Sequence, residues 1–184
     1  RGNRIGLFYN SDVELLSLDL SGQWKFSIVR QRGVTNADFD DSRWNEINVP
    51  GRWEDQGYPD HDGYAWYRTR FELPANLMRQ DLYLVLGKID DFDKVYLNGE
   101  MIGRTEHLRD FTRFRSSTAW QLYRVYKIPQ SKLQRNNVLV VEVRDERLDG
   151  GIYEGSVGIM TQSNAKIIED RNRPDFWSDP IRAV

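Results

Sequence analysis

One segment of the chain, residues 53–66, combines aromatic and polar side chains in a way that suits carbohydrate recognition. A pyranose ring has an apolar face that stacks on Trp or Tyr, while carboxylates, amides and basic groups hydrogen-bond to its hydroxyls. The structural alternative is that Trp66 is a core residue at the start of a strand and that residues 58–62 form a solvated turn. Both interpretations stay open. The candidate sugar contacts of this segment are Trp53, Tyr58, Asp60, His61 and Trp66.

A second candidate segment, residues 145–153, is a charged loop that follows an apolar run and contains Gly150 and Gly151. Acidic and basic side chains in such a loop can bind sugar hydroxyls, and a neighbouring Tyr can stack on the ring. An ordinary Asp-Gly turn is the competing interpretation, because Asp and Gly are both common turn residues. The candidate sugar contacts here are Arg147, Asp149 and Tyr153.

No catalytic residue can be assigned from the sequence. Glycoside hydrolysis requires two carboxyl groups about 5–10 Å apart across a cleft. No pattern among the 28 Asp and Glu residues singles out such a pair. The two histidines, His61 and His107, form no HExxH motif, and residues 155–158 do not form a nucleophile elbow. We therefore predict a chain without catalytic machinery of its own and without a cofactor.

Three acidic residues close together, Asp90, Asp91 and Asp93, suggest calcium, which prefers several oxygen ligands. Their spacing does not fit the EF-hand loop, which alternates its ligands and contains a glycine. Acidic residues in a turn are usually solvated charges. We therefore assign no metal site, and structural calcium stays as the minor alternative.

Composition and charge exclude several classes of function. The 184 residues include 26 Lys and Arg against 28 Asp and Glu, so the net charge of −2 provides no basic surface for nucleic acid. The absence of Cys excludes disulfides and thiolate metal sites. No apolar run is long enough to span a membrane. Because the chain begins at Arg1 rather than Met, we expect a processed or excised piece. A periplasmic or extracellular location in a bacterium is a separate expectation.

Short alternating runs of apolar and polar residues predict an antiparallel β-sandwich or barrel. Asn98 and Gly99 between two such runs predict a hairpin with a type I′ turn, because both residues tolerate positive φ. Single helical turns are expected at residues 40–44 and 130–133, and no pattern predicts a longer helix. The expected strands cover residues 24–28, 67–73, 81–87, 94–97, 100–103, 122–128, 138–143 and 158–161.

Several segments together resemble the sugar-binding domain of glycoside hydrolase family two, the β-galactosidase and β-glucuronidase group. They include the FDDSRW stretch followed by VPGRW, the WYRTRF strand and the VYLNGEMIG hairpin, in the order that the family has. The segment around Asp91 is also similar to a related jelly roll in sialic acid O-acetylesterases. The matching segments are Leu20–Phe26, Phe39–Trp44, Val49–Trp53, Gly63–Phe71, Val95–Gly103, Asn136–Val143 and Gly150–Tyr153.

The resemblance implies an all-β, galactose-binding-like jelly roll over residues 19–161. The residues outside it are expected to form an N-terminal tail at 1–18 and a C-terminal extension at 162–184, since the C-terminal stretch lacks a clear period. It implies a non-catalytic accessory module, because the catalytic carboxylates of family two lie on a separate (β/α)₈ barrel. The expected partner is a neighbouring catalytic domain or a weakly bound carbohydrate. In the family the region around Asp149 lies near the active site and can contribute an acidic sugar contact.

Two other classes of function stay open. One is a small glycan hydrolase or esterase, which requires two convergent carboxylates with a perturbed pKa. The other is a protein-interaction or sensor ectodomain, for which a large exposed apolar patch is typical. The apolar side chains of Phe176 and Trp177 near the C-terminus are compatible with this class. A strip of basic and aromatic residues at 104–115 is better explained as a loop or edge that covers a sheet.

Overall fold

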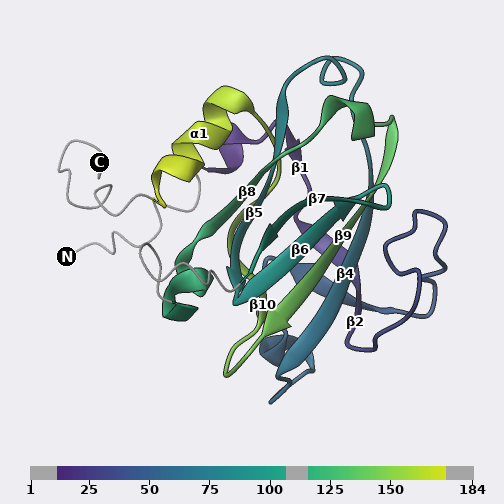
Figure 1. Cartoon of the computed structure of the whole chain (residues 1–184), viewed down its shortest axis with the longest axis vertical. Helices are drawn as coiled ribbons and strands as arrows, with labels where there is room; N and C mark the ends of the chain where they lie inside the picture. The colour runs from purple at the N-terminus through teal and green to yellow at the C-terminus, as the bar shows by residue number, and fades with distance from the viewer. Residues whose placement is uncertain (1–11, 107–115, 173–184) are drawn as a thin grey trace, which may run out of the picture.

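The computed structural model describes residues 12–106 and 116–172, which form two antiparallel β-sheets packed face to face, with one helix beside them (Figure 1). The helix is α1 (Gln162–Asp170), and the 3-10 turns are η1 (Val13–Leu15), η2 (Glu54–Gln56), η3 (Ser116–Gln121) and η4 (Gln130–Lys132). The strands are β1 (Leu18–Asp19), β2 (Gly22–Ser27), β3 (Asn45–Val49), β4 (Gly63–Glu72), β5 (Leu82–Asp90), β6 (Phe92–Leu97), β7 (Glu100–Thr105), β8 (Tyr123–Lys127), β9 (Asn136–Asp145) and β10 (Gly151–Thr161).

The two sheets form the β-sandwich of jelly-roll type that the sequence predicts. One sheet has the order β1-β10-β5-β8 and the other the order β3-β2-β4-β9-β6-β7. All neighbouring strands in both sheets are antiparallel. None of the helices within the described residues is long and apolar enough to span a membrane.

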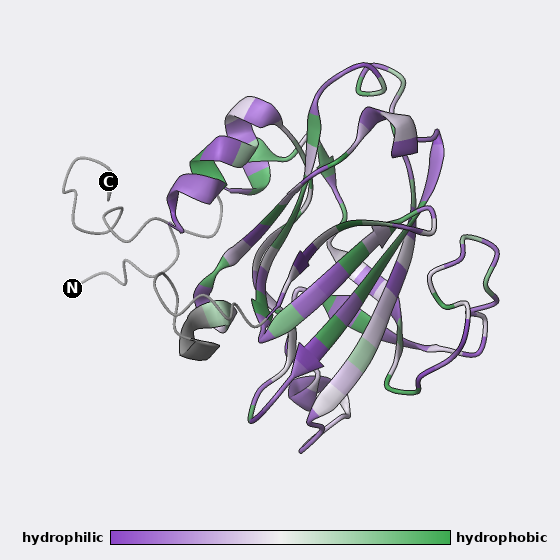
Figure 2. Cartoon of the chain, viewed as in Figure 1, coloured by the Kyte–Doolittle hydropathy of each residue, from purple (hydrophilic) through white to green (hydrophobic). Residues whose placement is uncertain are grey.

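The core lies between the sheets and follows from alternation along the strands (Figure 2). Leu139, Val141 and Val143 of β9 point into it and are fully buried, whereas the intervening Val140 faces the outer side of the sheet. Successive side chains of a strand point to opposite faces, so this period of two places one set of residues in the core. The interior of the sandwich is therefore filled by side chains.

The outer face of each sheet is also partly covered. Residues 30–44 form a loop over the six-stranded sheet, where Trp44 packs with Trp66 of β4. On the four-stranded sheet, Ala165 and Ile168 of α1 pack with apolar residues of β5 and β10. This second cover explains why the middle of β5 is apolar on both faces.

Two buried ion pairs hold polar groups inside these layers. The Arg68 Nε atom donates to Asp41 Oδ2 at 2.9 Å beneath the loop, and Arg124 Nε donates to Asp93 Oδ1 at 2.7 Å. Both guanidinium groups also donate to backbone carbonyls. A buried charge needs such partners, because an unpaired one loses its hydration without compensation. The expectation that Asp93 is a solvated turn residue is therefore wrong.

The sequence-based strand assignments are confirmed, since each expected strand overlaps one in the structure. Asn98 and Gly99 have φ values of 51° and 91°, as a type I′ turn requires. The short edge strands β1 and β3 were not predicted. Their few residues carry too little alternation to distinguish them from the turns beside them.

The expectation that no longer helix occurs is wrong, because α1 follows β10 directly. Only Ala165 and Ile168 of this helix are buried, so its sequence shows a weak apolar period. The assigned tails at residues 1–18 and 162–184 stay predictions, since the structure describes only part of each. Phe176, Trp177, His107 and the basic strip beyond residue 106 lie outside the described residues.

Replacement of Arg124 by Met tests the buried ion pair. The variant Arg124→Met leaves the Asp93 carboxylate buried without its cation, so we expect the free energy of unfolding to fall by about 3–5 kcal/mol. Urea unfolding measures this change. Arg104→Met is the control: its exposed pair with Glu106 at 3.4 Å is worth at most about 1 kcal/mol. Equal losses in the two variants would contradict the assignment.

A methyl group at Gly150 tests how closely the loop after β9 packs on the core. A Cβ atom at this position would lie 1.9 Å from Cζ2 of Trp53, which is fully buried. We expect Gly150→Ala to destabilise the fold by about 1–3 kcal/mol through this overlap. Thermal unfolding measures the effect, and the exposed Arg147→Ala serves as control with a change within about 0.5 kcal/mol. An unchanged Tm for Gly150→Ala would show that the two residues do not touch.

Candidate functional site

The two segments that the sequence singles out meet at one end of the sandwich. Gly51 N donates to Ile152 O at 2.7 Å, and Trp53 N donates to Gly150 O at 3.2 Å. These backbone bonds join the segment between β3 and β4 to the start of β10 and to the loop that precedes it. Residues 53–62 and 146–150 are the parts of these segments that lie outside the strands, and their direct contact was not foreseen from the sequence.

Charged side chains reinforce this junction. The carboxylate of Glu54 accepts hydrogen bonds from Gly150 N, with both oxygens at 3.0 Å. Arg52 Nη1 and Asp149 Oδ2 form an ion pair at 2.8 Å, and both side chains are about half exposed. Because Asp149 already has a cationic partner, a sugar hydroxyl would have to share or replace that contact. Arg52 and Glu54 were not among the predicted site residues.

Trp53, the first of the predicted sugar contacts, belongs to the core. Its side chain has no exposed surface, and its ring packs against Phe26 and His61 with centroid distances of 6.1 and 5.4 Å. A ring that stacks on a sugar needs one free face. Trp53 therefore supports the end loops from beneath and presents no face to a ligand.

The tip of the same segment carries the more accessible candidates. Tyr58 is partly buried, with its ring edge-on to Phe26 at 4.7 Å and its hydroxyl accepting from Asn45 Nδ2 at 2.7 Å. His61 is also partly buried, and its Nε2 donates to Tyr64 O at 3.2 Å. Asp60 is exposed and has a φ of 59° at the turn. The turn interpretation and a polar contact surface are both compatible with this geometry.

The remaining candidates lie on different surfaces. Trp66 is 8% exposed and lies under the loop on the outer face of the six-stranded sheet, so it is separated from the end loops. Arg147 is exposed on the β9–β10 loop beside Asp149. Tyr153 is partly buried on β10 and donates its hydroxyl to Trp120 O at 2.8 Å. The structure thus brings together part of the predicted set and leaves Trp66 outside it.

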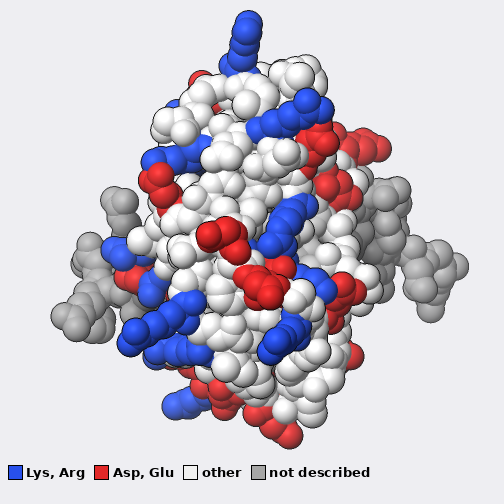
Figure 3. Space-filling view, turned by 90° about the vertical axis from the view of Figure 1, so that its right-hand side faces the viewer, with Lys and Arg blue, Asp and Glu red and all other residues white. Residues whose placement is uncertain are grey.

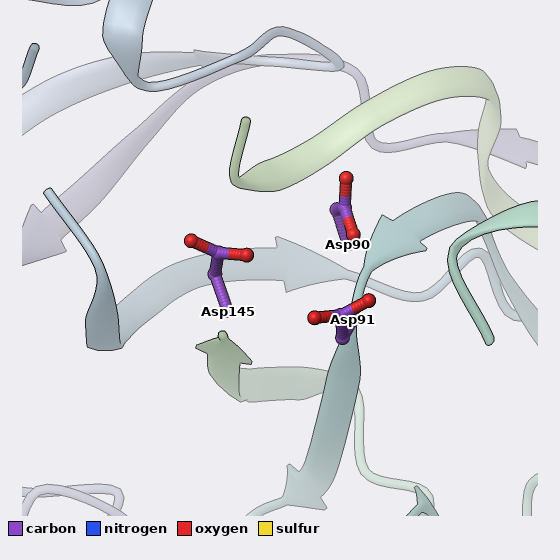
Figure 4. Close-up of side chains that lie close together, drawn as sticks. All are labelled: Asp90, Asp91 and Asp145. Carbon is purple, nitrogen blue, oxygen red and sulfur yellow. The ribbon is translucent and has the colours of Figure 1, made fainter. Parts of the chain in front are cut away.

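Three carboxylates converge at this end of the sandwich (Figure 4). Asp90 ends β5, Asp91 follows it, and Asp145 ends β9. One oxygen from each lies within 4.8 Å of one oxygen from each of the others. The sequence pointed to Asp90 and Asp91 but not to Asp145, which comes from the other sheet.

The electrostatic state of these carboxyls differs from that of exposed ones. Burial raises the pKa of Asp90 to about 8, with the neighbouring Asp91 carboxyl as a further cause. Burial likewise raises the pKa of Asp145 to about 7, partly offset by the hydrogen bond from Arg147 N and reinforced by the charge of Asp91. Both shifts express the cost of holding uncompensated negative charges close together away from water.

A surface cavity of about 220 Å³ lies beside this region. Tyr64 is the partly exposed aromatic residue of its lining. The Cζ atom of Arg30 lies 3.9 Å from the centroid of the Tyr64 ring, so one face of this ring is occupied. Lys94 and Glu142 form a loose pair across the lining at 3.9 Å. The cavity therefore offers less for ring stacking than for polar contacts. Its lining residues are Tyr64, Phe92, Asp93, Lys94, Thr105, Glu106, Glu142 and Arg144.

Surface charge shows no strong preference for one sign on the face drawn in Figure 3. Lys and Arg side chains are interspersed with Asp and Glu side chains over this face. This distribution agrees with the mixed, nearly neutral composition of the chain. A contiguous basic surface, which nucleic acid binding requires, is not seen on this side.

Comparisons with known proteins give a consistent result. The β-galactosidase of Vibrio cholerae is 25% identical over 114 residues, which cover 49% of this chain and 11% of that protein. A β-glucuronidase of Formosa agariphila is 21% identical over 149 residues, covering 74% of this chain and 14% of its own length. The chain thus spans only a small part of these relatives.

Solved structures show the same fold within larger enzymes. The crystal structure of Bacteroides uniformis β-glucuronidase matches 78% of this chain and 17% of its own, with a TM-score of 0.64 at 23% identity. A β-glycosidase from Bacteroides vulgatus matches with a TM-score of 0.62 at 19% identity, over 78% of this chain and 20% of its own.

A family model described as the β-galactosidase second all-beta domain matches residues 30–149. This match covers most of the sandwich, from the loop over the six-stranded sheet to the loop after β9. The resemblance seen in the sequence and the fold of the solved structures agree with it. The chain belongs to the family of the β-galactosidase second all-beta domain, and it is an accessory β-domain of the glycoside hydrolase family two type.

Proposed function

We propose that this chain is a non-catalytic module that docks onto a catalytic domain through the end loops at residues 50–62 and 145–151. The observation that carries the proposal is Leu148, whose side chain is 85% exposed on the second of these loops. Its φ of 75° is left-handed, a conformation that costs a residue with a side chain roughly 1–2 kcal/mol. A partner that covers Leu148 would offset the exposure of this apolar group.

The rigidity of the end loops supports docking rather than ligand entry. The backbone bonds of Gly51 and Trp53 to the opposite loop hold Leu148 on a fixed base. The interior of the sandwich is filled, so a partner meets only the loop surface. The named β-galactosidase and β-glucuronidase relatives are much longer than the matched region, which suits a module beside a catalytic neighbour.

Replacement of Leu148 tests the docking proposal. We expect Leu148→Ser to weaken binding of residues 1–184 to the separately produced remainder of the protein that carries them. The loss should be about 10- to 100-fold in Kd, because burying a Leu side chain is worth about 1.5–3 kcal/mol. Isothermal titration calorimetry measures both affinities.

The matched control for this experiment is Ile167→Ser on α1. Ile167 is also an exposed aliphatic residue, at 46%, but it lies on the helix rather than on the end loops. Its replacement should leave the affinity unchanged. Docking through the proposed end is wrong if Leu148→Ser binds as tightly as the parent chain.

Weak glycan binding at the same end is the second candidate. The observation in its favour is the group of polar side chains around Asp60, Asp149 and Arg147, which remain at least partly accessible. We expect calorimetric titration with galactosides, glucuronides and mannosides to give a weak signal that Asp149→Ala reduces. Calorimetry is preferred to Trp emission because Trp53 lies inside the core. No heat with any of the three sugar classes would remove this candidate.

The two other classes have less support. A small hydrolase or esterase requires convergent carboxylates, which Asp90 and Asp145 provide, but the cavity beside them is lined by other residues. An interaction ectodomain requires a large apolar patch, whereas the exposed apolar residues of the described part, such as Val13 and Met101, lie on separate elements. The periplasmic or extracellular location stays a prediction.

A further inference from the structure

The side chain of Gln56 ties one of the end loops to the edge of the six-stranded sheet. Its Oε1 atom accepts a hydrogen bond from Asn48 N at 2.7 Å, and its Nε2 atom donates to Asn48 O at 3.1 Å. A residue of an added antiparallel strand would exchange the same two bonds with Asn48. Since β3 is an edge strand of this sheet, the carboxamide takes the place of a neighbouring strand there.

The same carboxamide also holds the segment that leads from β3 to η2. Its Nε2 atom donates a second hydrogen bond to Arg52 O at 3.1 Å. The group lies directly against Gly51, because a Cβ atom at that position would be 2.7 Å from Gln56 Nε2. One side chain therefore satisfies backbone groups of both β3 and the first part of the end loop, and it fixes their separation.

Residues close to Gln56 in turn hold the second end loop, residues 145–151. Both carboxylate oxygens of Glu54, which belongs to the same turn η2, lie 3.0 Å from Gly150 N. Arg52, whose carbonyl oxygen accepts from Gln56, pairs through its guanidinium group with Asp149 at 2.8 Å. The carboxamide is thus connected to the second end loop through two residues that contact this loop directly.

We propose that Gln56 is a positioning residue of the docking end: it holds Arg52 and Glu54 in place on β3, and these two residues hold the loop that presents Leu148. This role rests on the docking function proposed above. A loop that is already ordered loses less conformational entropy when a partner covers it. Gln56 therefore raises the affinity for the partner through Leu148 and without a contact of its own.

Hydrogen exchange in residues 1–184 alone tests the first step of this path. The variant Gln56→Leu keeps a side chain of similar size but loses all three hydrogen bonds, so Glu54 should hold Gly150 N less firmly. We expect the Gly150 amide proton, followed by NMR, to exchange about 3- to 10-fold faster than in the parent chain. The amide of Val141 in the core should change by a smaller factor, since it exchanges only when the whole fold opens. An unchanged rate at Gly150 would overturn the proposal.

Calorimetric titration with the remainder of the protein tests the second step. We expect Gln56→Leu to weaken binding by about 3- to 10-fold in Kd, because the loop must then be ordered on binding. In the Leu148→Ser background the same substitution should change Kd by less than about 2-fold, because the side chain that Gln56 positions is gone. A full additional loss in that background would show that Gln56 makes a contact of its own, and the positioning role would be wrong.

The matched control is Gln80→Leu. Gln80 Nε2 donates to Asn76 O at 2.9 Å between β4 and β5, so this variant also loses a bond from a carboxamide to the backbone. Its Kd and its Gly150 exchange rate should equal those of the parent chain. If the parent chain does not bind the remainder, docking is wrong, and the exchange rate of Gly150 still decides whether Gln56 orders the loop. If the parent chain binds and Gln56→Leu binds equally tightly, only the positioning role is wrong.

Discussion

The packing of Trp53 against Gly150 is the contact on which the arrangement of the end loops depends. The indole fills the core beneath the loops, and only a glycine leaves room for the backbone to pass over it. This close approach brings the backbones of the two loop segments within hydrogen-bonding distance. The Arg52–Asp149 pair and the Glu54 contact form on top of that base. A side chain at position 150 would push the two loops apart and disrupt the surface that they form together.

The strands could be predicted from the sequence because their signal is local. The apolar, β-branched Val138–Val143 run and the Asn98–Gly99 turn are each recognised from neighbouring residues, and runs and turns of this kind indicate the two antiparallel sheets. The role of Trp53 could not be predicted in this way. It stands beside Arg52 and Glu54 in a polar stretch typical of a loop, and the partners that bury it come from distant parts of the chain.

The proximity of Asp90, Asp91 and Asp145 could not be predicted from the sequence either. Asp90 ends a strand of the four-stranded sheet and Asp145 ends a strand of the six-stranded sheet, so their proximity depends on how the sheets stack. No local pattern reports this. A similar reason explains the missed helix α1, whose position is determined by the apolar outer face of β5 and β10 rather than by its own weak period. Residues that act together across layers become visible only when the layers are assembled.

One contact of α1 affects how the domain can be connected to other chains. Arg171, just beyond the helix, forms a bidentate ion pair with Asp12, and Asn164 Nδ2 donates to Leu15 O. The first and last described segments are thereby fastened side by side. A domain whose entry and exit points adjoin can be inserted into a surface loop of another protein without forcing that loop apart, and its ends can be joined by a short linker to give a circular permutant.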